Sequence, residues 1–140
     1  MSTPLALAPA GTSRLGRSVL AVGAALVANA ALSLAVDQLL HVLDVYPPWG
    51  QPMHEPALNL LALSYRLAFG VAAGWLVARL APAAPARHAA VLGAIATVLS
   101  ALGVAAALTH DLGPAWYPVA LAVLAYPTVR LGAAWHERRA

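Results

Sequence analysis

Four long apolar stretches constrain this chain more than any other feature of its sequence. Short, proline-rich segments separate the stretches, which cover residues 18–42, 57–80, 88–108 and 115–134. Each has roughly 20 residues or more, enough for a helix to cross a hydrocarbon core of about 30 Å. They are continuously apolar rather than alternating, which favours helices over the strands of a membrane barrel. The sequence therefore predicts an all-α, polytopic membrane protein built as a four-helix bundle.

The composition argues against a soluble domain and against several classes of function. Of the 140 residues, 61% are hydrophobic and 9% are charged, whereas a soluble domain covers itself with many more charged side chains. Cysteine is absent, which excludes disulfides and thiolate sites. The basic residues form no stripe with interleaved aromatics, so we expect a lipid bilayer as partner and no nucleic acid. Without a phosphate-binding loop, nucleophile elbow or paired carboxylates, we expect no enzyme, no catalytic residue and no cofactor.

The positions of the arginines predict how the chain crosses the membrane. All but Arg66 precede the first stretch, flank the loop between the second and third, or close the fourth, whereas segments 44–56 and 109–114 contain none. The positive-inside rule then places both termini and the second loop in the cytoplasm (N-in/C-in). We expect a flexible cytoplasmic tail over residues 1–17, one membrane domain over 18–135 and a short cytoplasmic tail over 136–140.

Two further patterns concern the cell and the N-terminus. The chain is rich in residues with GC-rich codons and contains one isoleucine and two asparagines, which suggests a bacterium and hence its plasma (inner) membrane. Arg14 and Arg17, an apolar run and Ala28-Asn29-Ala30 also fit a cleavable signal peptide. The apolar sequence continues to residue 42, beyond the usual length of a signal core, and this favours a retained helix.

Polar side chains inside the apolar stretches are costly in lipid, so function is sought there first. Asn29, Asp37 and His41 lie at multiples of four residues and form one stripe on a helix. Arg66 and Asn59 lie on one face of the second stretch, and a hairpin brings Arg66 to the depth of Asp37. We predict an ion pair between the two charges. One hypothesis is that the pair, with the two asparagines, locks the register of two helices; the other is that Asp37 or His41 carries a proton or cation.

Histidines and carboxylates also gather near the predicted outer face. His41, His54, His110 and Asp111 have the ligand types that hold a divalent metal, and His41 with His110 could ligate a haem iron. Their spacing matches no recognised metal motif. The alternative is that polar residues are simply tolerated at the level of the lipid headgroups.

Two local patterns concern helix packing. Gly70 and Gly74 form a G-x-x-x-G motif, which suits close packing inside one bundle or between protomers. Pro127 lies within the fourth stretch and predicts a kink there.

Three segments carry a resemblance to a known group of proteins. They are Tyr46-Pro-Pro-Trp-Gly50 with Met53, the segment from Leu80-Ala-Pro to Leu92-Gly93, and Gly113-Pro-Ala-Trp-Tyr-Pro118. With them, the chain from about residue 37 to 132 resembles a group of small bacterial membrane proteins with four helices. The resemblance implies the fold and the location, and it transfers no activity and no site residue.

Three functions follow as expectations. The first is a non-enzymatic bundle that acts as a homo-oligomer or as a small accessory subunit of a larger membrane complex. The second is a proton- or cation-coupled transporter or channel that uses Asp37, His41 and Arg66, in a dimer or larger assembly. The third is a metal- or haem-binding membrane protein with its site at the outer face.

Overall fold

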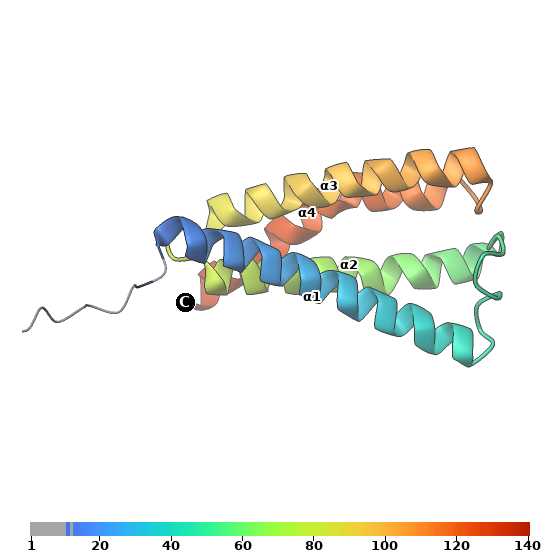
Figure 1. Cartoon of the computed structure of the whole chain (residues 1–140), viewed down its shortest axis with the longest axis horizontal. Helices are drawn as coiled ribbons and strands as arrows, with labels where there is room; N and C mark the ends of the chain where they lie inside the picture. Colours follow the sequence, from blue (N-terminus) through green and yellow to red (C-terminus); the bar gives the residue numbers. More distant parts are fainter. Residues whose placement is uncertain (1–10, 12) are drawn as a thin grey trace, which may run out of the picture.

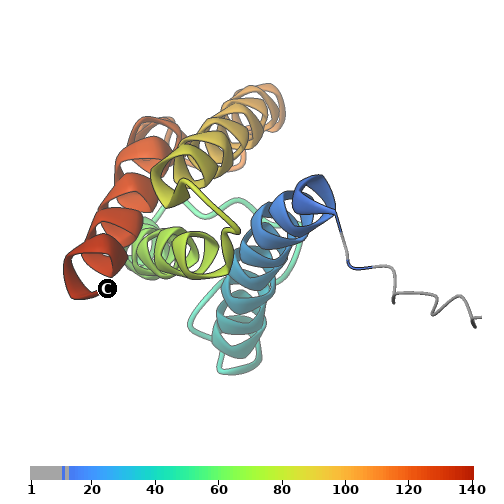
Figure 2. The same cartoon turned by 90° about the vertical axis from the view of Figure 1, so that its left-hand side faces the viewer.

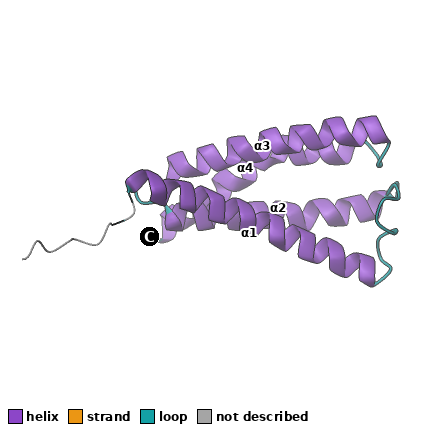
Figure 3. Cartoon of the chain, in the orientation of Figure 1, coloured by secondary structure: helices purple, strands orange, loops and turns teal. Residues whose placement is uncertain are grey.

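The computed structural model describes residues 11 and 13–140, and this part of the chain folds into helices joined by short loops, without a strand (Figure 3). The helices are α1 (Arg14–Val42), α2 (Pro56–Leu80), α3 (Pro85–His110) and α4 (Trp116–Arg139). All four are long and apolar enough to cross a membrane. The predicted all-α, four-helix architecture is therefore confirmed. Most of the tail predicted over residues 1–17 lies outside the described residues.

The helices run along the long axis of the molecule and define two chemically different ends (Figure 1). At one end lie the start of α1, the loop between α2 and α3, and the end of α4; we call it the basic end because most of the arginines gather there. At the other lie the loops at residues 43–55 and 111–115; we call it the acidic end because it carries Asp44, Glu55 and Asp111. Figures 1 and 2 show α1 diverging from α3 toward the acidic end.

Capping and end charges extend two helices beyond the predicted apolar stretches. The helix α1 begins at Arg14 because the Ser13 hydroxyl accepts a hydrogen bond from the backbone N–H of Gly16 at 3.1 Å. The helix α4 continues to Arg139, with basic side chains in its last turn. Positive charge there is favourable beside the free carbonyls of a helix C-terminus. Pro127 lies inside α4, which continues through it as a helix.

Small side chains form the core in the half of the bundle nearer the basic end. The core cluster consists mostly of alanines, with Val77, Leu92 and Val129 as its larger members. The helices α2 and α4 approach each other closely, and a Cβ atom at Gly74 would overlap the carbonyl group of Val129. A Cβ atom at Gly132 would overlap the carbonyl group of Val71 in the same way. Within this chain, the G-x-x-x-G motif therefore packs α2 against α4.

Candidate functional site

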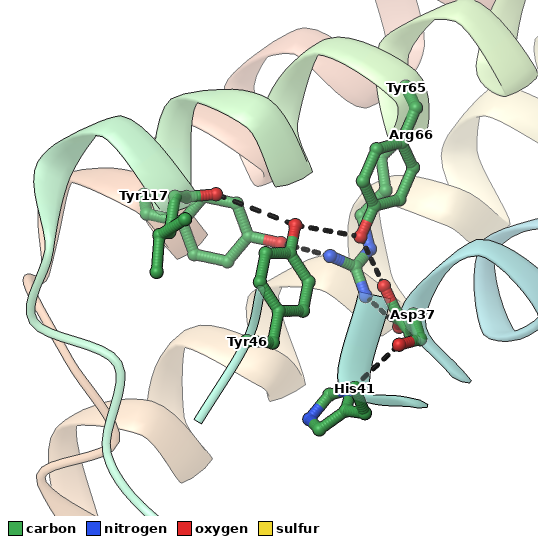
Figure 4. Close-up of polar contacts among 7 residues, drawn as sticks. Asp37, His41, Tyr46, Tyr65, Arg66 and Tyr117 are labelled. Carbon is green, nitrogen blue, oxygen red and sulfur yellow. Dashed lines mark hydrogen bonds and ion pairs between the residues drawn. The ribbon is translucent and has the colours of Figure 1, made fainter. Parts of the chain in front are cut away.

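A buried carboxylate organises the polar site in the half nearer the acidic end. Asp37 on α1 is 6% exposed, and its Oδ2 atom lies 2.5 Å from Nη2 of Arg66 on α2. Its other oxygen accepts a hydrogen bond from the hydroxyl of Tyr65. Figure 4 shows both donors converging on the carboxylate. Each oxygen of Asp37 therefore has a partner from α2, which offsets the cost of removing the charge from water.

Arg66 extends this contact to a third helix. Its Nη1 atom donates a hydrogen bond to the hydroxyl of Tyr117 on α4 at 2.5 Å (Figure 4). Its Cζ atom also lies 5.5 Å from the centroid of the Tyr65 ring, within the range of a cation–π contact. One guanidinium group thus joins α1, α2 and α4 at the same depth of the bundle.

Tyr46 closes the site from the loop that follows α1. Its side chain is 5% exposed, and its hydroxyl lies 3.2 Å from the Tyr65 hydroxyl and 3.5 Å from the carbonyl oxygen of Leu58. Burial raises the pKa of the Tyr46 hydroxyl above its ordinary value. The hydroxyl is therefore protonated at neutral pH and can donate to its neighbours.

Sequence reasoning missed the three tyrosines. Tyr46 and Tyr117 fit an aromatic belt at the headgroup level, and Tyr65 carried no signal beyond its place beside Arg66. In the structure all three hydroxyls turn toward the ion pair or toward one another. A useful signal would have been the need of a buried pair for further donors, since two side chains rarely satisfy each other completely. We call Asp37, Arg66, Tyr46, Tyr65 and Tyr117 the polar lock.

The other predicted intramembrane residues make no hydrogen bond to a side chain of the polar lock, although the His41 ring contacts the Tyr46 ring edge-to-face with centroids 5.5 Å apart. The Nδ1 atom of His41 donates to the backbone carbonyl oxygen of Asp37 at 2.6 Å, and its ring stacks on Trp49 with centroids 3.9 Å apart. Asn59 donates to the carbonyl oxygens of Met53 and Glu55 at 2.8 and 2.9 Å, and so fastens the loop to the start of α2. The buried Oδ1 atom of Asn29 has no hydrogen-bond partner among the described residues. Neither asparagine supports the ion pair directly.

The structure does not bring the predicted metal ligands together. Among residues 11 and 13–140, no three histidine or carboxylate side chains are grouped so that they could hold a metal ion. His54 lies in the first loop, while His110 and Asp111 lie at the end of α3. His41 belongs to α1, which diverges from α3 toward this end (Figure 1). The arrangement therefore shows no pairing of His41 and His110 for a haem.

A cavity of about 300 Å³ borders the polar lock between α2, α3 and α4. Its polar wall includes Arg66, Asn59 and Tyr117, and its remaining surface is mainly apolar or glycine-rich. This volume is at the lower end of the range of small-ligand sites.

The fold and the site together define a helical bundle with an internal ion pair. Comparisons with models of known families, with curated proteins and with solved structures find no match for this chain.

Proposed function

We propose that this chain is a multi-pass protein of the bacterial plasma (inner) membrane and works there as a non-enzymatic helical bundle. It acts as a homo-oligomer or as a small accessory subunit of a larger membrane complex. The observation that carries the structural role is the closure of the Asp37–Arg66 pair by partners from within the chain.

The geometry of the pair favours a structural role over transport. A carboxylate that carries a proton or cation has to release its partner during each cycle. Here both oxygens of Asp37 are held by α2, and Arg66 is held in addition by Tyr117. A charge near the middle of a membrane helix costs about 2.5–3.5 kcal/mol to insert. Pairing the two charges within the chain offsets that cost and sets the register of α1, α2 and α4.

The separation of charge between the two ends supports an orientation in which both termini, and with them the basic end, lie in the cytoplasm. The basic end carries the N-terminal pair Arg14 and Arg17, and the loops of the acidic end contain no arginine. A reporter that is active only in the cytoplasm should therefore work when fused after Ala140 or inserted near Ala84. The same reporter inserted near Gly50 should be silent. Activity near Gly50 together with silence after Ala140 would reverse the orientation.

The long apolar faces of α1 and α3 support association within the membrane. Large side chains along both helices are more than half exposed, among them Leu20, Val27 and Leu34 on α1 and Val98 and Leu102 on α3. In a bilayer such faces contact lipid or the helices of a neighbouring subunit. Cross-linking in native membranes, followed by purification in mild detergent, should yield a defined homo-oligomer or a constant partner. A chain that remains monomeric in native membranes would overturn this part of the proposal.

One observation favours the alternative of proton- or cation-coupled transport. Hydrogen bonds connect Tyr46 through Tyr65, Asp37 and Arg66 to Tyr117, and a cavity reaches Arg66. Against it, the apolar core lies between this network and the basic end. The discriminating measurement is pH-driven flux in proteoliposomes. Flux that is abolished by Asp37→Asn in a stably folded variant would establish transport, and its absence in the parent protein would favour the structural role.

Metal or haem binding, with His41, His54, His110 and Asp111 as ligands, is the weakest of the three functions because the structure does not group these side chains. Elemental analysis and visible absorbance of the protein purified from its own membranes test it directly. A stoichiometric metal or haem that is lost on His41→Ala with His110→Ala would revive it.

A further inference from the structure

A second pocket lies at the basic end, far from the polar lock, between the last turns of α2 and α4. It encloses about 630 Å³, within the range of small-ligand sites. Figure 2, which faces the basic end, shows the two helix ends beside each other. The side chains that give the pocket its chemistry are Trp75 and Arg79 from α2 and Trp135, His136 and Arg139 from α4.

Each arginine of this pocket stacks on a tryptophan of its own helix. The Cζ atom of Arg79 lies 5.3 Å from the Trp75 ring centroid, and that of Arg139 lies 4.9 Å from the Trp135 ring centroid. Such cation–π contacts hold a guanidinium beside an aromatic ring. Because neither guanidinium has an ion-pair partner among the described residues, its N–H groups are available to a ligand, in the fork that matches a phosphate. His136 packs edge-to-face on Trp75 with centroids 5.7 Å apart and narrows the wall between the helices.

Neither arginine of this pocket has an ion-pair partner within the described chain. The only ion pair among residues 11 and 13–140 is Arg66–Asp37, so no carboxylate of these residues pairs with Arg79 or Arg139. The C-terminal ends of α2 and α4 each contribute a partial charge of roughly −0.5, and the carboxylate of Ala140, which also lines the pocket, forms no ion pair with either guanidinium group. Two arginines beside aromatic rings therefore present N–H groups without an ion-pair partner at this pocket.

We propose that this pocket binds the phosphate group of an anionic phospholipid from the leaflet at the basic end. Basic pockets between transmembrane helices on the cytoplasmic side suit such headgroups, and the exposed Trp135 ring lies where the glycerol and upper acyl chain would pass. The proposal rests on the membrane placement given above. Failure of that placement would appear in the reporter fusions, whereas failure of this proposal would appear in lipid selectivity.

The test compares lipid binding to the full chain and to two double variants. Native mass spectrometry in detergent measures adducts of phosphatidylglycerol and of phosphatidylcholine with the same acyl chains. Arg79→Gln with Arg139→Gln removes both guanidinium groups of the pocket. Arg87→Gln with Arg138→Gln removes the same charge from the same end without touching the side chains of the pocket, and thermal melting checks that both variants fold.

We expect the parent protein and the Arg87/Arg138 control to prefer phosphatidylglycerol, and the Arg79/Arg139 variant to bind it about thirtyfold more weakly. Arg79→Lys with Arg139→Lys should retain part of the binding, since it keeps the charge and loses the fork. Equal losses in the two glutamine variants, or no preference over phosphatidylcholine in the parent, would overturn the proposal. Inorganic phosphate that displaces the lipid adduct at millimolar concentration would assign the site to a soluble anion instead.

Discussion

The two halves of this bundle are held together by opposite means. In the half nearer the basic end, alanines and glycines let the helices approach closely, and the core cluster contains no polar side chain. In the half nearer the acidic end, α1 diverges from α3, and the polar lock joins α1, α2 and α4 with charged and hydroxyl groups. Without a hydrophobic force between helices in lipid, packing and hydrogen bonds are the two remaining means of association. Each half uses one of them.

This comparison predicts different failures in the two halves, and breaking the ion pair should have the largest effect. Asp37→Asn leaves Arg66 charged without a carboxylate, and Arg66→Leu leaves Asp37 charged. We expect each single change to lower the free energy of unfolding by about 3–5 kcal/mol, measured by denaturation in detergent. Asp37→Leu with Arg66→Leu should recover most of the loss, because no charge then remains unpaired. Single variants as stable as the parent would show that the lock contributes nothing to the acidic half.

Overfilling the glycine contact should be the next most damaging change. Gly74→Leu and Gly132→Leu each place a side chain where the backbone of the facing helix lies. We expect a loss of about 3 kcal/mol in the free energy of unfolding, with α2 and α4 forced apart. Gly23→Leu on α1 is the matched control, since a Cβ atom there meets nothing within 4 Å. Because leucine is the better helix former, Gly23→Leu should not lower stability, and equal losses at all three positions would show that the close α2–α4 contact is not their cause.

Removing one donor from Asp37 should have a moderate effect. Tyr65→Phe deletes the hydroxyl that bonds to the carboxylate and keeps the ring that contacts Arg66. A hydrogen bond to a charged group contributes about 1.5–3 kcal/mol, so we expect a loss of about 2 kcal/mol in the same denaturation assay. If Asp37→Leu with Arg66→Leu already removes the charge, adding Tyr65→Phe should cost less than it does alone. If Tyr65→Phe costs the same free energy in the parent and in the double-leucine variant, Tyr65 does not stabilise the Asp37–Arg66 pair.

Tyr46 should show the smallest effect and a dependence on pH. Tyr46→Phe should cost about 1 kcal/mol at neutral pH, since the bond that it removes joins uncharged groups. Because burial raises the pKa of Tyr46 in the folded state, its contribution is complete below the ordinary tyrosine pKa of about 10 and is lost as pH rises beyond it. The difference in melting temperature between the parent and Tyr46→Phe should therefore narrow from pH 8 to pH 11. A difference in melting temperature that stays constant over this pH range would contradict the burial of the Tyr46 hydroxyl.

Much of the fold was predictable because each helix depends on the composition of its own segment. A continuous apolar run of about 20 residues has few stable structures in lipid other than a helix, and the segments between the runs carry prolines that suit helix boundaries. The prediction of an Asp37–Arg66 contact needed one more step, the hairpin between two adjacent helices. Counting residues from the helix ends places both charges at a similar depth. Because an unpaired charge in lipid is costly, the two are then expected to pair.

Local patterns in the sequence do not show which helix packs against a given face. Periodicity assigned Gly70 and Gly74 to a packing face without indicating which helix would meet it, since neighbouring helices and other protomers present similar small residues. The structure selects α4, with Val129 and Gly132 at the contact. The same limit applies to Asn59, which one hypothesis grouped with the ion pair as a register lock; its side chain donates to the carbonyl oxygens of Met53 and Glu55.

By itself, the sequence determined the number of helices, their approximate lengths and the asymmetry of charge between the two ends, because these depend on composition along one dimension. Only the tertiary structure decided that Tyr46, Tyr65 and Tyr117 complete the lock, and that no three histidine or carboxylate side chains of the described residues gather as a metal site. Those outcomes depend on the rotation of each helix about its own axis and on the divergence of α1 from α3 (Figure 1). Both are set by how all the helices pack together, and no single segment contains that information.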